Sequence, residues 1–324
     1  MPDKLSIALG VYDRTLPLIA GLTPIEGVES TFVCDPLESI FHRAFDEVAF
    51  DVSELSFSNF LHLAAAGTCP YVGIPIFPSR AYRHSIVYVR TDRAIASAKD
   101  LAGRRVGVRE YSMTAALVAR GLLKDDFGLE AASIQWTCGR VDASDTPPVV
   151  RVRPRGIELD QLDDEDNLSD ALLEGRIDAM FAYRPPPAFT VGSGVGRLFT
   201  DHIASEQDYA RRTGIFPIMH LIGIRRDLAQ GDLPFRIAMA FEASKAFAIK
   251  RLGDSQAPFS SLPWSAGEFH HTRALLGADY WSYGIQNNMA ELESLVRYSV
   301  DQGIIEREME IENLFCPSLL NWNT

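Results

Sequence analysis

Five side chains with anion-binding or proton-transfer chemistry fall within six positions, namely Ser79, Arg80, Tyr82, Arg83 and His84. They lie between two strand-like segments, residues 72–77 and 85–89. The planar guanidinium of arginine matches a carboxylate, and histidine exchanges protons near neutral pH. On a chain with a formal net charge of −12, this cluster predicts a site for a small carboxylated ligand.

An extended backbone over residues 81–84 would place Arg80, Tyr82 and His84 on one face and Arg83 on the other. We therefore assign Arg80 and Tyr82 to ligand binding and His84 to acid–base chemistry. The alternative is structural: Arg80 would pair with an internal carboxylate, and His84 would be a packed, hydrogen-bonded histidine.

Two further candidates directly follow predicted strands, where ligands of open α/β folds bind. Arg14 comes after the strand at residues 5–9, and it either reaches the ligand or forms a local pair with Asp13. Glu54 comes after the strand at residues 50–52, and it either handles a proton or pairs with an arginine. Ser56 either contacts the ligand or caps the next helix.

The remaining candidates lie later in the chain. His220 opens the predicted strand at 219–224 and faces either the ligand or the interior. Glu110, Tyr111 and Ser112 stand between a predicted strand and a helix beginning at Met113. Ser112 and the free amides of that helix could hold a carboxylate, or Ser112 could simply cap the helix.

The pattern indicates neither a metal nor a cofactor. His270 and His271 are adjacent, so on a helix they point about 100° apart and do not share one ion. The four cysteines show no paired short spacing, which argues against a zinc cluster or a disulfide framework.

Composition limits the class of protein. The acidic balance argues against a nucleic-acid partner, and no apolar run approaches the roughly 20 residues of a membrane helix. The N-terminal residues lack the apolar core of a secretory signal, so we expect a cytoplasmic protein without a membrane partner. The apolar stretch 314–320 indicates a buried contact, either within the chain or between subunits of a homo-oligomer.

Strand-like and helical segments alternate along the 324 residues, which predicts an α/β fold with largely parallel sheets and two lobes. The sequences DLAGRRVGV (100–108) and LEGRIDAMF (173–181) resemble lobe-entry segments of the periplasmic-binding-protein-like fold of type II. The resemblance implies crossover strands near 86–90 and 219–224 and a ligand cleft between the lobes. We expect one lobe from residues 1–88 plus 221–324 and another from 89–220.

Several motifs resemble a narrower family, the 4,5-dihydroxyphthalate decarboxylases. They are GVYDRT (10–15), DVSELS (51–56), FPSRAYRH (77–84), YVR (88–90), RTGIFPIMH (212–220) and WSYG (281–284). The resemblance runs from about residue 4 to about residue 304 and implies decarboxylation of a hydroxylated aromatic dicarboxylate to protocatechuate, without a cofactor. Residues 140–170 and 184–187 depart from the family pattern and leave the exact substrate open.

The implied chemistry requires an acid at the ring carbon and a base at the para hydroxyl. His84 and His220 are our candidates for this pair, with Glu54 as another acceptor of the phenolic proton. A non-catalytic protein that binds or senses an aromatic carboxylate is the alternative function.

Overall fold

The computed structural model describes residues 3–145, 149–257 and 259–324. The chain divides into two compact units, which we describe separately. Unit 1 comprises Met1–Arg80, Ala210–Glu293 and Met309–Thr324, and unit 2 comprises Ala81–Tyr209 and Ser294–Glu308. The expected boundaries lay after residues 88 and 220, whereas this division falls after Arg80 and after Tyr209.

The sheet of unit 1 has the strand order β2-β1-β3-β11-β4. The strands are β1 (Asp3–Ala8), β2 (Val28–Val33), β3 (Val52–Ser56), β4 (Tyr71–Arg80) and β11 (Ile218–Arg225). β1 runs parallel to β2 and β3, and β11 runs antiparallel to both β3 and β4. Every residue of β3 is buried, as expected of a strand covered on both faces.

The sheet of unit 2 has the order β10-β5-β9-β6-β7-β8. Its strands are β5 (Val87–Arg90), β6 (Arg105–Val108), β7 (Gln135–Cys138), β8 (Leu159–Gln161), β9 (Ala179–Phe181) and β10 (Val195–Arg197). Four of them are parallel neighbours, and β5 is antiparallel to β9 and β10. Within each unit the sheet is therefore largely parallel, which confirms the predicted α/β class.

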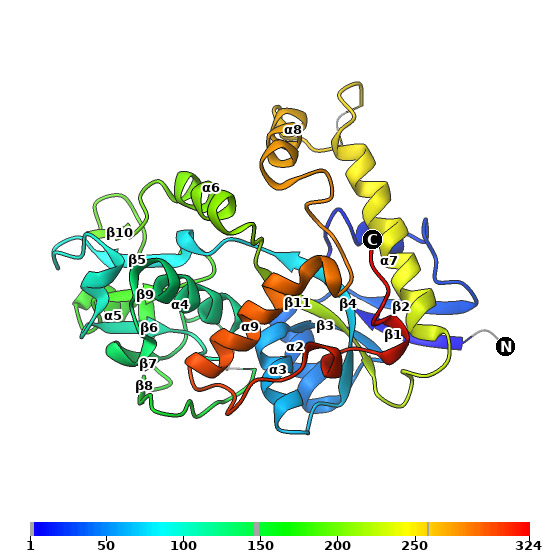
Figure 1. The fold of residues 1–324 in the computed structure, drawn as a ribbon. Coiled ribbons are helices and arrows are strands. Elements are labelled where there is room, and N and C mark those ends of the chain that lie inside the picture. Colours follow the sequence, from blue (N-terminus) through cyan, green and yellow to red (C-terminus); the bar gives the residue numbers. More distant parts are fainter. Residues whose placement is uncertain (1–2, 146–148, 258) are drawn as a thin grey trace. The chain divides into compact units, whose positions relative to one another are not determined.

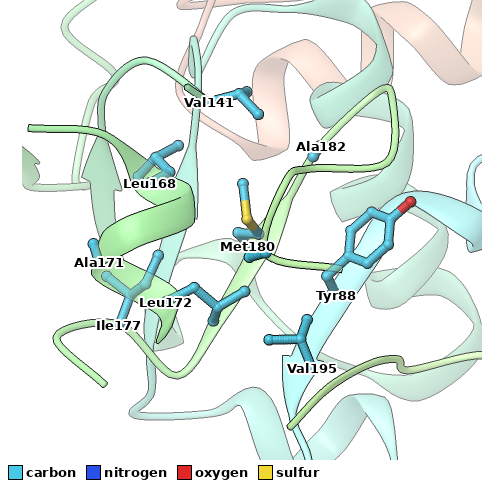
Figure 2. Packing of buried hydrophobic residues seen from close by; sticks show 10 residues of the cluster. Tyr88, Val141, Leu168, Ala171, Leu172, Ile177, Met180, Ala182 and Val195 are labelled. Carbon is cyan, nitrogen blue, oxygen red and sulfur yellow. The ribbon is translucent and has the colours of Figure 1, made fainter. Parts of the chain in front are cut away.

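Helices lie beside the sheet in each unit (Figure 1). The helices are α1 (Leu16–Ile19), α2 (Leu37–Glu47), α3 (Phe57–Ala65), α4 (Thr114–Phe127), α5 (Leu168–Glu174), α6 (His202–Thr213), α7 (Leu233–Leu252), α8 (Ser265–Leu276) and α9 (Met289–Asp301). Of these, α8 stands away from the sheet of unit 1. In unit 2, α5 packs Leu168, Ala171 and Leu172 against Met180 of β9 and Tyr88 of β5 (Figure 2).

The end of α9 belongs to unit 2 because it packs against α4. Gly121 of α4 lies so close to the ring of Tyr298 that a Cβ would approach it to 2.4 Å. Arg120 of α4 also donates to the Oε1 atom of Gln302 at 2.6 Å. This packing joins residues 294–308 to unit 2, which the expected boundaries did not include.

One expectation about the connections is wrong. The predicted crossover strands do not pass between sheets, because β5 lies in the sheet of unit 2 and β11 in that of unit 1. The described part of residues 140–167 is irregular apart from β8, and residues 146–148 lie outside the described residues.

The apolar C-terminal stretch is buried within its own unit. Cys316 donates its amide to the carbonyl of Gly73 at 2.8 Å, and the ring of Phe315 packs edge-on to Phe77 of β4. Leu314 and Leu319 are buried as well. Of the two contacts proposed for this stretch, the structure places it in the one within the chain.

Candidate functional site

The register between β3 and β11 brings Glu54 and His220 together. Ser56 lies opposite His220, and Glu54 lies opposite Ile222 in this antiparallel pair. Opposite residues, and residues two apart on one strand, point to the same face of a sheet. Glu54, Ser56 and His220 therefore share one face, although 166 positions separate Glu54 from His220 in sequence.

Glu54 is fully buried and is surrounded by hydrogen-bond donors. Its Oε2 atom accepts the amide of Gly10 at 2.8 Å, and its Oε1 atom accepts the hydroxyl of Tyr12 at 2.8 Å. Oε1 also lies 2.6 Å from the Nδ1 atom of His220. The expected arginine partner is wrong: Glu54 is held by a histidine, a tyrosine and a backbone amide.

The charges of this cluster follow from these contacts. Burial favours the neutral form of Glu54, but the hydrogen bond and charge of His220, with the bonds from Gly10 and Tyr12, lower its pKa overall. Burial, together with the charge of Glu54, raises the pKa of Tyr12. An ionised Glu54 facing a neutral Tyr12 is therefore the state that the geometry supports.

His220 is oriented by Glu54. An ionised carboxylate only accepts hydrogen bonds, so the Nδ1 atom of His220 carries the proton that faces Glu54. The edge of the Phe41 ring also contacts the imidazole, with ring centroids 4.9 Å apart. The Nε2 atom makes no hydrogen bond to the described residues, and the side chain is 15% exposed. Nε2 is thus the atom of this pair that is available to exchange a proton.

Arg14 lies beside the pair, with its guanidinium between two aromatic rings. Its Cζ atom is 4.3 Å from the centroid of Tyr12 and 3.9 Å from that of Trp281. Nε donates to the carbonyl of Pro78 at 2.6 Å, and Nη1 donates to Asp13 at 3.0 Å. Nη2 makes no hydrogen bond to the described residues. Arg14 can therefore pair with Asp13 and also bind a ligand, since the pair leaves its Nη2 group available to an anion.

Sequence reasoning missed Tyr12 and Trp281, although both stand in motifs that it singled out. Tyr12 connects the Glu54–His220 pair to Arg14, because its hydroxyl bonds to Glu54 and its ring stacks against the guanidinium of Arg14. Trp281 is fixed by a hydrogen bond from its Nε1 atom to the carbonyl of Phe77 at 2.9 Å. The signal that could have found Tyr12 was its place in the loop that carries Arg14.

Ser56 is buried at the N-cap position of α3, but its hydroxyl makes no cap hydrogen bond. The capping alternative is therefore wrong. Ser56 and Ser79 are the cross-strand neighbours of His220, one on β3 and one on β4. Ser56 keeps its place in the candidate site because it shares a sheet face with Glu54 and His220.

Arg80 is committed to internal partners of unit 1. Its side chain is 1% exposed, and it donates to the carbonyls of Phe216 and Ser282 at 2.9 Å each. It also bonds to the side-chain oxygen of Asn288 and lies 3.8 Å from Glu291. These contacts favour the structural alternative for Arg80 over substrate binding.

The segment after Arg80 is not extended, so the expected shared face is wrong. β4 ends at Arg80, residues 81–83 form no regular structure, and His84 begins a short 3-10 helix. Arg80 belongs to unit 1, whereas Tyr82 and His84 belong to unit 2. The chain passes from unit 1 to unit 2 at this point, so the alternation of side chains between the two faces of a strand ends at Arg80.

Tyr82 and His84 lie in an aromatic cluster of unit 2. The imidazole of His84 is buried and packs edge-on to Phe199 and Tyr209, with centroids 5.1 and 5.7 Å away. The ring of Tyr82 also packs edge-on to Tyr209. This surrounding favours the packing alternative for His84.

Glu110 and Ser112 hold a loop of unit 2. Glu110 is buried and accepts the amides of Val149 and Val150 at 2.8 and 3.4 Å. The hydroxyl of Ser112 lies 3.0 Å from Glu110 and 3.2 Å from the carbonyl of Val150. Ser112 does not cap α4, whose N-cap position is Met113. Both side chains therefore stabilise this loop.

Tyr111 is buried beneath the guanidinium of Arg120, which lies 3.8 Å from its ring centroid. Glu110 and Tyr111 also line a hollow of about 1090 Å³ at the carboxyl ends of β6, β7 and β8. Arg151 and Arg153 lie on its wall.

Among the described residues, no group of three or more His, Cys, Asp or Glu side chains is arranged to hold a metal ion. His270 and His271 are exposed on α8, as expected. No helix in the described part of the chain has the length and apolar character needed to span a membrane.

Solved structures define the class of fold. The chain is similar to the periplasmic aliphatic sulphonate binding protein of Escherichia coli, with a TM-score of 0.56 and 15% identity over 99% of both chains. It is also similar to the desulfurization enzyme DSZB, with a TM-score of 0.53 and 14% identity over 98% of both. The fold is therefore that of the type II periplasmic binding proteins, as predicted.

Sequence relatives define the family more narrowly. No protein-family model matches the chain. A 4,5-dihydroxyphthalate decarboxylase of Comamonas testosteroni is 39% identical over 98% of this chain and 97% of its own length. Another from Pseudomonas putida is 39% identical over 64% of this chain and 81% of its own. The chain belongs to the 4,5-dihydroxyphthalate decarboxylase family.

Proposed function

We propose that this chain is a carboxy-lyase that converts a hydroxylated aromatic dicarboxylate, such as 4,5-dihydroxyphthalate, to protocatechuate and CO2. The observation that carries this proposal is the 39% identity to a decarboxylase of this name over nearly the full length of both chains. The cluster of Glu54, His220 and Arg14 supports it, because it combines proton transfer with a cation for a carboxylate.

The chemical problem is the electron pair that remains on the ring when CO2 leaves. A hydroxyl para to the departing carboxylate solves it: the hydroxyl loses its proton while the ipso carbon gains one. The ring passes through a dienone-like intermediate, and the C–C bond then breaks so that its electrons restore aromaticity. A base at the hydroxyl and an acid at the ring carbon are therefore needed. In our proposal solvent water delivers the ring proton, and the phenolate formed when CO2 leaves takes its own proton back from the base.

We assign the base to the Nε2 atom of His220. Glu54 fixes the imidazole through Nδ1 and stabilises the positive charge that develops as Nε2 takes up the phenolic proton. Glu54 itself is saturated by three donors, so it acts through His220 and is a positioning residue.

Arg14 is our candidate for the carboxylate that stays on the ring. Its Nη2 group is not bonded to the described residues, and the two flanking aromatic rings hold the guanidinium plane in place. An anchor of this kind should contact the retained carboxylate, because clamping the departing one would stabilise the ground state.

Incubation of the purified protein with 4,5-dihydroxyphthalate tests the function. We expect equimolar CO2 and protocatechuate to appear, with saturation kinetics. Saturable binding without either product would support the alternative, a binding or sensing protein. A cytoplasmic location also stays a prediction, which cell fractionation would test.

A further inference from the structure

A hollow between α7 and α8 is rich in positive side chains. It measures about 590 Å³, which suits a small ligand, and its lining residues all belong to unit 1. Its wall includes Lys250 and Arg251 from the last turn of α7, and His270 and Arg273 from α8. Among the described residues, Asp254 is the one acid on this wall. On a chain with a formal net charge of −12, this local excess of positive charge predicts an anionic ligand.

Asp254 is engaged by the backbone of its own turn. Its Oδ1 atom accepts the amides of Gln256 and Ala257 at 2.9 and 3.2 Å. These two hydrogen bonds, with a smaller contribution from the charge of Arg251, lower the pKa of Asp254. The carboxylate therefore closes a turn, and it forms no ion pair with the cations of the hollow within the described part of the chain.

The side chains of Lys250, Arg251 and Arg273 make no hydrogen bond or ion pair to the described residues. Basic residues are favoured in the last turn of a helix, because they face the negative end of its dipole. That preference explains one cation at each helix end. It does not explain why cations from two helices line the same hollow together with aromatic rings.

Each arginine of the hollow packs over a phenyl ring four positions earlier in its own helix. The Cζ atom of Arg251 lies 5.7 Å from the centroid of Phe247, and that of Arg273 lies 5.5 Å from the centroid of Phe269. Both rings also line the hollow. Stacking on a ring orients the planar guanidinium without occupying its hydrogen-bond donors. Both guanidinium groups are therefore positioned and able to donate.

The ring of Phe269 is fixed by close packing between the two helices. Phe269 is 8% exposed, and a Cβ on Gly253 would lie only 2.9 Å from its Cε1 atom. The glycine thus lets the end of α7 approach α8. The apolar part of the wall is packed in place, as expected of a preformed ligand site.

We propose that this hollow binds a small aromatic dicarboxylate, at a site that shares no residue with the one around His220. One carboxylate accepts hydrogen bonds from Arg251 and the other from Arg273, since the guanidinium group matches a carboxylate. The ring of the ligand packs against Phe247 and Phe269. An inorganic anion such as sulfate would meet the cations but leave both rings uncovered.

Calorimetric titration with phthalate tests this site. Phthalate lacks the hydroxyl that the proposed decarboxylation needs, so its binding does not depend on turnover. We expect the native chain to bind two molecules, one at Arg14 and one in the hollow. Arg251→Met combined with Arg273→Met should weaken the second at least about tenfold. Because neither arginine takes part in the proposed reaction, kcat and the thermal unfolding midpoint of this double variant should stay near the native values.

Two controls accompany the titration. Arg307→Met removes an exposed arginine of unit 2 and should leave both binding events unchanged. Succinate carries two carboxylates without a ring and should bind the hollow at least about tenfold more weakly than phthalate.

The outcomes separate this site from the proposed function. Two binding events that both persist in the double variant would overturn the proposal, and so would a single event that only Arg14→Met removes. Succinate that binds as tightly as phthalate would overturn the aromatic class of the ligand. A single event that only the double variant loses would support the hollow and contradict the role given to Arg14.

Discussion

The two units each bury a carboxylate but use it differently. Glu54 of unit 1 lies within β3 and not after a strand as predicted, whereas Glu110 of unit 2 lies two residues after β6; both accept several hydrogen bonds. The donors to Glu54 include His220, whose Nε2 atom stays available. The donors to Glu110 include two backbone amides and the hydroxyl of Ser112, and Arg109 lies 3.7 Å from its Oε2 atom.

This difference assigns Glu54 to the candidate site and Glu110 to a structural role. The sequence marked both carboxylates as candidates because each was predicted to follow a strand, and ligands bind beyond the carboxyl ends of strands. The hydrogen-bond partners then distinguish the two carboxylates. Glu54 orients His220, whose Nε2 atom can still exchange a proton, whereas Glu110 fixes a loop. The hydrogen-bond partners also distinguish the two arginines. The Nη2 group of Arg14 is available to a ligand, whereas the side chain of Arg80 donates to internal carbonyl groups.

The largest expected effect is on turnover. His220→Asn removes the proton-transfer atom but keeps a polar side chain of similar size, and we expect kcat to fall roughly 100-fold or more. Substrate binding, measured by titration under non-turnover conditions, should persist.

His84→Asn is the matched variant in unit 2. Because His84 packs among aromatic rings, we expect its loss to reduce kcat less than about tenfold, below the range of acid–base catalysis. Equal losses in both variants would instead support the two-histidine mechanism, and the reverse order would make His84 the main proton-transfer group.

The second prediction compares the two arginines. Arg14→Met should remove one charge-assisted contact to the substrate, worth about 1.5–3 kcal/mol, and raise KM about 10- to 100-fold. The variant should remain folded, because the methionine side chain can still pack between the rings of Tyr12 and Trp281.

Arg80→Met is the control for this comparison. It leaves buried acceptors and Glu291 without their cation, so we expect the free energy of unfolding to fall by about 3–5 kcal/mol. Its KM in the folded protein should stay near the native value. A KM change with unaltered stability would return Arg80 to substrate binding.

The third prediction concerns stability against pH. The pKa of Glu54 is lower in the folded chain than the value of about 4.3 in an unfolded one, so the unfolded state binds more protons between these values. The stability that Glu54 contributes is present above the unfolded pKa and is lost as the pH falls through the folded pKa.

Glu54→Gln should therefore lower the free energy of unfolding at neutral pH and make it fall less on acidification. Urea unfolding at several pH values measures this, with exposed Glu308→Gln as the control. A Glu54→Gln variant with the full native acid dependence would show that Glu54 carries none of it.

Local elements were largely predictable because the chain marks them clearly. α5 and α8 each end before a glycine with positive φ, Gly175 and Gly277, a signal that the sequence displays directly. The site was predictable only as a set of candidates. The contact between Glu54 and His220 depends on β11 pairing antiparallel with β3, which no local signal specifies.

The wrong expectations share a physical cause. An extended backbone at residues 80–84 was predicted to place Arg80, Tyr82 and His84 on one face. The chain leaves the sheet of unit 1 at Arg80, however, and residues 81–83 form no strand. Helix capping was the alternative considered for Ser56 and Ser112, from residue type alone. Ser112 instead bonds to Glu110 and Val150, partners set by tertiary packing.

Chemical rescue of His220→Ala most directly tests the claim that this imidazole transfers the proton. Added imidazole should enter the space left by the side chain and restore a substantial part of the lost turnover, in a saturable manner, while it leaves His84→Ala unchanged. A His220→Ala variant that turns over normally, or one that is folded and binds substrate but is not rescued while His84→Ala is, would contradict the account.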